Sequence, residues 1–259
     1  MNETATKKVT DDEKEMAFLD HLEELRWRLI KAIVAVMICA IAVYFFSDKV
    51  LTVLINPYNE ALSKLNKTDA QKLIFLAPTG GFMIHIKLAV FSGIFLSLPI
   101  IFYQLWQFIA PGLFESEKKY VPLVVVLSTL CFAVGALFCY FVVLRYGLRF
   151  LLSFETSDLI ATISVNEYLQ FITMLLLVFG LIFELPILAF FLTKVGFLTP
   201  AFMRYYRRHG IVTMVILAAL ITPPDIFTQL LLAGPLVLLY EISIVVSKFA
   251  LKKSESQAE

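Results

Sequence analysis

Charged residues are scarce in this 259-residue chain. Asp, Glu, Lys and Arg make up 17% of it, whereas hydrophobic residues make up 59%. An ordinary soluble domain has about 25% charged and about 45–50% apolar residues. A soluble core of this length cannot bury so much apolar surface, so lipid must cover part of the protein. The formal net charge of +1 gives no reason to expect a nucleic-acid partner.

Catalytic and metal-binding signatures are also missing. The three cysteines, Cys39, Cys131 and Cys139, all lie inside apolar runs and lack the spacing of metal ligands. No pair of histidines has metal-binding spacing either. The chain contains no nucleophile elbow, zinc-protease motif, phosphate-binding loop or dinucleotide fingerprint. We therefore expect no enzyme activity, no cofactor and no metal site.

Long apolar runs are the main feature that is present. A membrane-spanning helix needs about 20 mostly apolar residues. Four runs meet this length well and the last two are weaker: Ile30–Phe46, Phe82–Tyr103, Tyr120–Val143, Tyr168–Thr193, Ile211–Ile221 and Ile226–Ser247. The sequence predicts an all-α, polytopic membrane protein with about six transmembrane helices, the last two of them short. This domain spans 21–247, between a charged N-terminal extension (1–20), which has no cleavable-signal pattern, and a basic and polar tail (248–259).

Lysine and arginine are distributed unequally between the two sets of connecting segments. They are enriched at both termini and in the segments after the second and fourth spans. Because cytoplasmic loops carry an excess of Lys and Arg, we expect both termini to be cytoplasmic. The opposite connections, Ser47–Gly81 and Leu144–Glu167, are long. Their apolar residues have near-helical spacing, which predicts short amphipathic segments packed over the spans.

Glu184 is the residue that fits lipid least well. It follows Phe179-Gly-Leu-Ile-Phe well inside the fourth span. An ionised carboxylate at mid-bilayer costs on the order of 3 kcal/mol. We expect Glu184 to be protonated, paired or facing water, and Pro186 to kink the helix beside it. A carboxyl group that only bonds to a neighbouring helix is the simpler interpretation, but acids inside membranes are usually functional.

Three other polar segments allow more than one interpretation. The pattern of His21–Leu29 by itself favours an interfacial helix before the first span. The segment with Phe108 and Glu117 is aromatic and acidic; its acids suit a basic ligand, or they neutralise the lysines that follow. Asp225, four residues before Gln229, is explained most simply as the cap of the last helix.

Together these segments resemble the TatC family, the core subunit of the twin-arginine protein translocase, from about His21 to Val246. The resemblance rests on four motifs in the right order: His21-Leu-x-Glu-Leu-Arg26-x-Arg28-Leu29, Tyr103-Gln-x-Trp-x-Phe108-Ile-Ala-Pro111-Gly-Leu-x-x-x-Glu117, Phe179-Gly-x-x-Phe183-Glu184-x-Pro186 and Thr222-Pro-Pro-Asp225-x-x-x-Gln229. The six-span topology of the family, with both ends cytoplasmic, agrees with the topology expected from the apolar runs and basic residues.

The resemblance implies a receptor in the bacterial cytoplasmic (inner) membrane. TatC-like proteins bind signal peptides with consecutive arginines, together with the folded cargo attached to them. Carried onto this chain, the signal-peptide-binding residues are Glu24, Arg26, Phe108 and Glu117. Carboxylates suit guanidinium groups, and an aromatic ring can stack on their planar faces.

The resemblance also implies partners inside the membrane. Single-span subunits of the TatA and TatB type are expected to dock along the last two spans. The intramembrane polar contacts are then Glu184, Asp225 and Gln229. Transport would use the proton-motive force, and the chain would form a homo-oligomer within a hetero-complex. A proton- or ion-coupled small-molecule transporter also explains Glu184 and Asp225, but such proteins usually have repeated halves, and this sequence shows no repeat.

Overall fold

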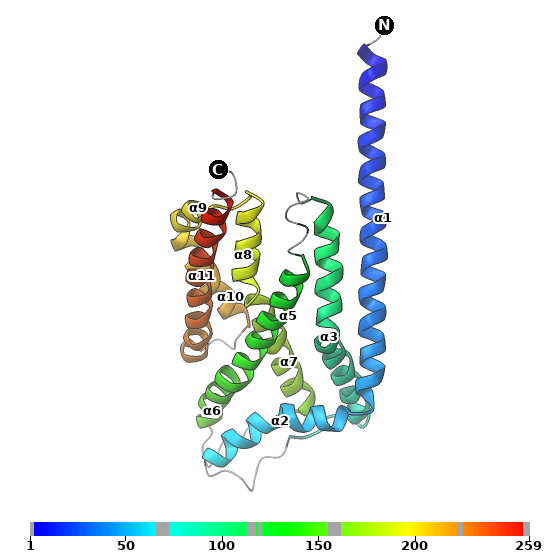
Figure 1. The fold of residues 1–259 in the computed structure, drawn as a ribbon. Helices are drawn as coiled ribbons and strands as arrows, with labels where there is room; N and C mark the ends of the chain where they lie inside the picture. Colours follow the sequence, from blue (N-terminus) through cyan, green and yellow to red (C-terminus); the bar gives the residue numbers. More distant parts are fainter. Residues whose placement is uncertain are drawn as a thin grey trace. The chain divides into compact units, whose positions relative to one another are not determined.

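The computed structural model describes residues 3–65, 73–112, 118, 121–154, 162–221 and 225–255. Every named element in these ranges is a helix, as Figure 1 shows, and the predicted all-α class is confirmed. The elements in chain order are α1 (Glu3–Tyr44), α2 (Ser47–Lys64), α3 (Gly80–Ile109), η1 (Ala110–Gly112), α5 (Val121–Phe138), η2 (Cys139–Leu144), α6 (Arg145–Ser153), α7 (Val165–Ile182), α8 (Leu185–Lys194), α9 (Pro200–Tyr205), α10 (Arg207–Ile221) and α11 (Ile226–Glu255).

Five helical stretches of the described chain are long and apolar enough to cross a membrane. They are Asp20–Tyr44, Gly80–Ile109, Val121–Ser153, Val165–Lys194 and Ile226–Leu251. They match the four strong predicted spans and the last one. The fifth predicted span lies within α10, which has only 15 residues and is short as expected.

The last helix is longer than expected. α11 has 30 residues and continues well beyond Glu241. The Glu241 carboxylate pairs with Arg207 at the start of α10, so its charge is compensated without ending the helix. Of the last two helices, therefore, only α10 is short.

The described chain contains two compact units: Met1–Phe45 with Ala89–Val125, and Phe46–Leu88 with Val126–Glu259. In the first unit, α1 and the later part of α3 approach closely at Gly93. A Cβ atom on Gly93 would lie 2.7 Å from the backbone nitrogen of Ala40. Small residues let membrane helices come together in this way. Many apolar side chains of α1 are exposed, as expected of a helix covered by lipid, including Leu29, Ile33, Met37, Ile38 and Ile41.

In the second unit, α2 lies crosswise to α7 (Figure 1). Two tyrosine hydroxyls hold it there. Tyr140 of η2 donates a hydrogen bond to the carbonyl of Val53 at 2.8 Å, and Tyr168 of α7 donates one to the carbonyl of Leu54 at 3.0 Å. The predicted amphipathic segments in the two long connections are thus helices, α2 and α6, and they contact each other.

Glu60 links α2 to α6. Its Oε2 accepts a hydrogen bond from Nη2 of Arg145 at 2.8 Å, and its Oε1 lies 2.9 Å from Nζ of Lys64. The hydrogen bond from Lys64 first, and the one from Arg145 with it, hold the pKa of Glu60 below its ordinary value of 4.5. Because the pKa is lowered by folding, the stabilisation is present above pH 4.5 and is lost as the pH falls through the folded pKa.

We therefore expect the apparent Tm of the purified protein to fall as the pH drops below about 4.5. A Glu60→Gln variant should lose part of this acid sensitivity, because its side chain does not titrate. Thermal unfolding in detergent over a pH series measures both effects. Glu167→Gln, which removes an exposed carboxylate, is the control. Identical pH profiles of Tm for the wild-type protein and Glu60→Gln would show that Glu60 does not contribute to the acid sensitivity.

α5 and α7 pack closely through two glycines. A Cβ atom on Gly180 would lie 2.4 Å from Cζ of Phe132, whose ring is fully buried. A Cβ atom on Gly135 would lie 2.7 Å from the carbonyl oxygen of Phe179. A side chain at Gly180 would have to displace the buried Phe132 ring, and one at Gly135 would have to displace the backbone of α7. This contact fixes the end of α7, and Glu184 follows it by one helical turn.

Gly180→Ala should therefore destabilise the protein by about 1–3 kcal/mol, the usual effect of overpacking a core. It should lower the apparent Tm in detergent, and Phe132→Leu added to the same chain should restore part of the loss. Gly81→Ala is the control, since no atom lies within 4 Å of its added Cβ. An unchanged Tm for Gly180→Ala would show that α5 and α7 are not tightly packed here.

Candidate functional site

Polar side chains surround Glu24 in the first unit. Oε1 of Glu24 accepts hydrogen bonds from Arg28, from Nε at 2.8 Å and also from Nη2. Nδ1 of His21 lies 3.8 Å from Oε2 of Glu24. The His21 ring stacks on the ring of Phe108 from α3, with centroids 4.3 Å apart and planes 12° apart. We refer to these four residues, His21, Glu24, Arg28 and Phe108, as the Glu24 site.

The helical repeat explains how the Glu24 site forms. Residues three and four apart share one face of a helix, so His21 and Arg28 lie on either side of Glu24. The His21–Phe108 stack then connects α1 to the last turn of α3. The structure thus brings two predicted residues, Glu24 and Phe108, into one site. It adds His21 and Arg28, which the spacing around Glu24 could have indicated.

Arg26, a third predicted binding residue, takes no part in these contacts. Arg26 is exposed on α1, and within the described ranges it forms no ion pair. Glu117 lies outside the described residues.

The Glu24 carboxylate retains capacity for a further donor. Arg28 uses Oε1, while the distance from Oε2 to His21 exceeds that of a hydrogen bond. The side chain of Glu24 is 33% exposed. A guanidinium group from outside the chain can therefore reach an open carboxylate oxygen next to a pair of stacked rings.

Glu184 lies at a break between two helices in the second unit. α7 ends at Ile182 and α8 begins at Leu185, with Pro186 as its second residue. The backbone N–H of Glu184 donates to the carbonyl of Leu181 at 3.1 Å, so the chain stays hydrogen-bonded through the break. Pro186 cannot donate such a bond, and helices are interrupted at such positions. The predicted kink beside the acid is confirmed.

The Glu184 side chain is buried against α5. It is 6% exposed and interacts with the Ser128 hydroxyl and the backbone of Phe132. Its Oε1 is buried and, among the described residues, has no hydrogen-bond partner. A buried polar atom without a partner costs about 1–3 kcal/mol. Contact with a neighbouring helix therefore explains only part of this carboxyl group, and Oε1 stays available to a donor from another molecule.

Glu184→Leu should raise the apparent Tm or leave it unchanged, because it removes an unpaired buried acceptor worth about 1–3 kcal/mol. Ser128→Ala should lower the apparent Tm, since it removes the hydroxyl partner of Glu184 and leaves the carboxyl group in place. Thermal unfolding of both variants in detergent shows whether each substitution raises or lowers the apparent Tm. A lower Tm for Glu184→Leu would show that the carboxyl group stabilises the fold.

Asp225 caps the last helix. Its Oδ1 accepts a hydrogen bond from the backbone N–H of Thr228 at 2.6 Å, and its Oδ2 accepts one from the Thr228 hydroxyl. This is the pattern of an N-cap, as predicted. Nε2 of Gln229 is 3.5 Å from the carbonyl oxygen of Val215 on α10. The contacts of both residues thus lie within the α10–α11 hairpin.

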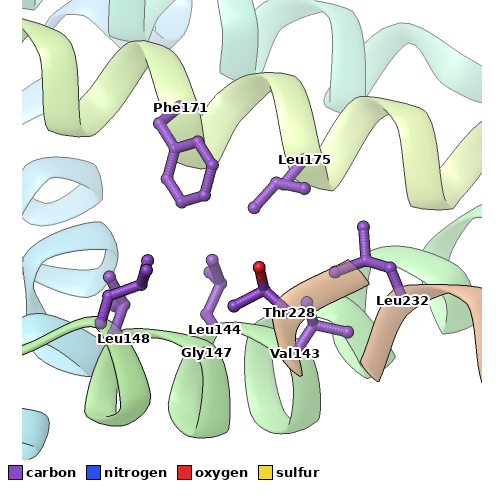
Figure 2. Close-up of a pocket in the computed structure, with 9 residues that line it drawn as sticks. Val143, Leu144, Gly147, Leu148, Phe171, Leu175, Thr228 and Leu232 are labelled. Carbon is purple, nitrogen blue, oxygen red and sulfur yellow. The ribbon is translucent and has the colours of Figure 1, made fainter. Parts of the chain in front are cut away.

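A small cavity lies in the second unit (Figure 2). Its volume is about 10 Å³, room for roughly one water molecule. The lining residues are Val143, Leu144, Gly147, Leu148, Leu151, Phe171, Leu175, Thr228 and Leu232. None of these side chains is ionisable, and Thr228 supplies the one side-chain oxygen. This cavity does not provide the polar lining that an ion-coupled transporter needs.

A family model described as Sec-independent protein translocase protein (TatC) matches residues 20–235. The chain belongs to the TatC family. TatC of Desulforapulum autotrophicum is 38% identical over 248 residues, which cover 96% of this chain and 90% of that protein. TatC of Helicobacter pylori (strain 26695) is 39% identical over 228 residues, which cover 88% and 86% respectively.

The fold agrees with a solved TatC structure. A crystal structure described as twin arginine translocase receptor TatC matches with a TM-score of 0.77 at 39% identity, over 89% of this chain and 99% of that one. The chain is therefore a multi-pass membrane component of the twin-arginine translocase and a transport protein. The predicted family and the predicted function in protein transport are confirmed. The TatC residues that bind peptide and partner subunits stay predictions.

Proposed function

We propose that this chain is the signal-peptide receptor of the translocase. It binds twin-arginine signal peptides of folded cargo proteins on the cytoplasmic face of the bacterial inner membrane. The observation that carries the proposal is the Glu24 carboxylate, which holds one guanidinium group through Oε1 and leaves Oε2 open. A solved relative described as the twin arginine translocase receptor supports it.

Each residue of the site has a role in this proposal. One arginine of the peptide pairs with Oε2 of Glu24, beside the ring of Phe108, and the second pairs with Glu117. Hydrogen bonds between guanidinium and carboxylate groups are charge-assisted and can be bidentate, which a lysine cannot reproduce. Arg26 donates to the carbonyl groups of the peptide backbone. Arginine preference thus follows from donor geometry as well as from charge.

Glu184 acts after binding. Its buried and unpaired Oε1 accepts a hydrogen bond from an inserted peptide or from a single-span subunit of the TatA or TatB type. Asp225 and Gln229 position the α10–α11 hairpin, along which these subunits dock. Further copies of the chain join the same complex, and the proton-motive force drives transport. Both termini lie in the cytoplasm, in keeping with their lysines and arginines.

Glu24→Gln should weaken binding of a twin-arginine peptide by about 1–3 kcal/mol, the scale of a lost hydrogen bond to a charged group. Fluorescence anisotropy of a labelled peptide with the purified protein in detergent measures the change. Glu117→Gln should have an effect of similar size.

Glu23→Gln is the matched control, because Glu23 is an exposed acid on the adjacent position of α1 and no ion pair of the described residues involves it. It should leave the affinity unchanged. A twin-lysine peptide tests the donor geometry. If the wild-type protein bound the twin-lysine and twin-arginine peptides equally, the receptor function would be refuted.

A further inference from the structure

A basic pocket lies in the second unit between α9, the start of α10 and the later part of α11. Its volume is about 370 Å³, large enough for a headgroup rather than a water molecule. It is lined by Arg204, Arg207, Glu241, Ile244, Val245 and Lys248. None of these residues belongs to the Glu24 site, and Glu184 does not line the pocket.

The pocket carries an excess of positive charge. Glu241 is its one carboxylate, and it pairs with Nε of Arg207. The guanidinium group of Arg207 keeps its other donors. Within the part of the chain that the structure describes, Arg204 and Lys248 form no ion pair. Three cations around one compensated carboxylate favour an anion.

The pocket is also apolar on one side. Ile244 and Val245 contribute to its lining, and both belong to the candidate membrane span Ile226–Leu251. Val245 is part of a stripe of exposed apolar residues at helical spacing along one face of α11, formed by Leu238, Ile242, Val245 and Phe249. An anion that fits this surface has a charged head and an attached apolar chain.

We propose that this pocket binds the phosphate group of an anionic phospholipid, with an acyl chain along the stripe on α11. Arg204 and Lys248 provide unpaired donors, and Arg207 provides its remaining donors to the phosphate oxygens. Basic pockets between membrane helices commonly bind lipid headgroups. Free inorganic phosphate shares the charge but does not use the apolar side. The Arg207–Glu241 pair lowers the affinity, because the carboxylate competes with phosphate for Arg207.

Native mass spectrometry of the full-length, delipidated protein tests this proposal. The protein is titrated with phosphatidylglycerol and, separately, with phosphatidylcholine of the same acyl chains. Phosphatidylglycerol should bind more tightly. The double variant Arg204→Gln and Lys248→Gln should weaken its binding by about fivefold for each cation removed. Arg208→Gln is the matched control: this neighbouring arginine is exposed but does not line the pocket, so binding should not change.

Glu241→Gln gives a test that misfolding cannot imitate, because it should tighten phosphatidylglycerol binding by freeing Arg207. Three results would overturn the proposal. The first is equal binding of the two lipids, and the second is a loss of binding in Arg208→Gln as large as in the double variant. The third is an affinity for inorganic phosphate equal to that for phosphatidylglycerol, which would indicate a site for a free anion.

Discussion

Lipid offers no hydrogen bonds, so polar groups inside the spanning helices must find partners within the protein. Most of those described here do. The hydroxyls of Thr193 and Ser247, for example, bond to each other at 2.6 Å between α8 and α11. Oε1 of Glu184 is the buried side-chain atom of the described residues that has no such partner. A buried oxygen without a hydrogen-bond partner carries a free-energy penalty. A hydrogen bond from another subunit or from a peptide would remove that penalty.

The packing around Glu184 gives this carboxyl group a defined position. Gly135 and Gly180 let α5 and α7 meet at their closest approach, and the buried ring of Phe132 fills the remaining space. Pro186 then interrupts the helix one turn later. The acid therefore lies on a rigid part of the fold, although the helix is broken beside it. Rigid placement lowers the conformational entropy that the Glu184 side chain itself must lose when a partner forms a hydrogen bond to it.

Features encoded by neighbouring residues could be predicted from the sequence. The apolar runs predicted the spans, Pro186 predicted the break beside Glu184, and Asp225 has the residue type and position of an N-cap. Features that depend on contacts between residues distant in the chain could not be predicted from the sequence. Glu241 lies in the interior of α11, and its charge is compensated by Arg207, 34 residues away. The stacking of His21 on Phe108 depends in the same way on how α1 meets α3.

The Arg28–Glu24 pair has a consequence for the selectivity of the proposed peptide-binding site. Arg28 already occupies Oε1 of the carboxylate, so the unliganded protein neutralises part of the negative charge of Glu24 with a guanidinium group of its own. A ligand with one arginine therefore meets a carboxylate whose charge Arg28 has already partly neutralised, and it gains little from the open Oε2 alone. A ligand with two adjacent arginines adds a second contact that Arg28 cannot match. Under the proposed receptor function, Arg28 would thus act against ligands with isolated basic residues, which are abundant in unrelated proteins.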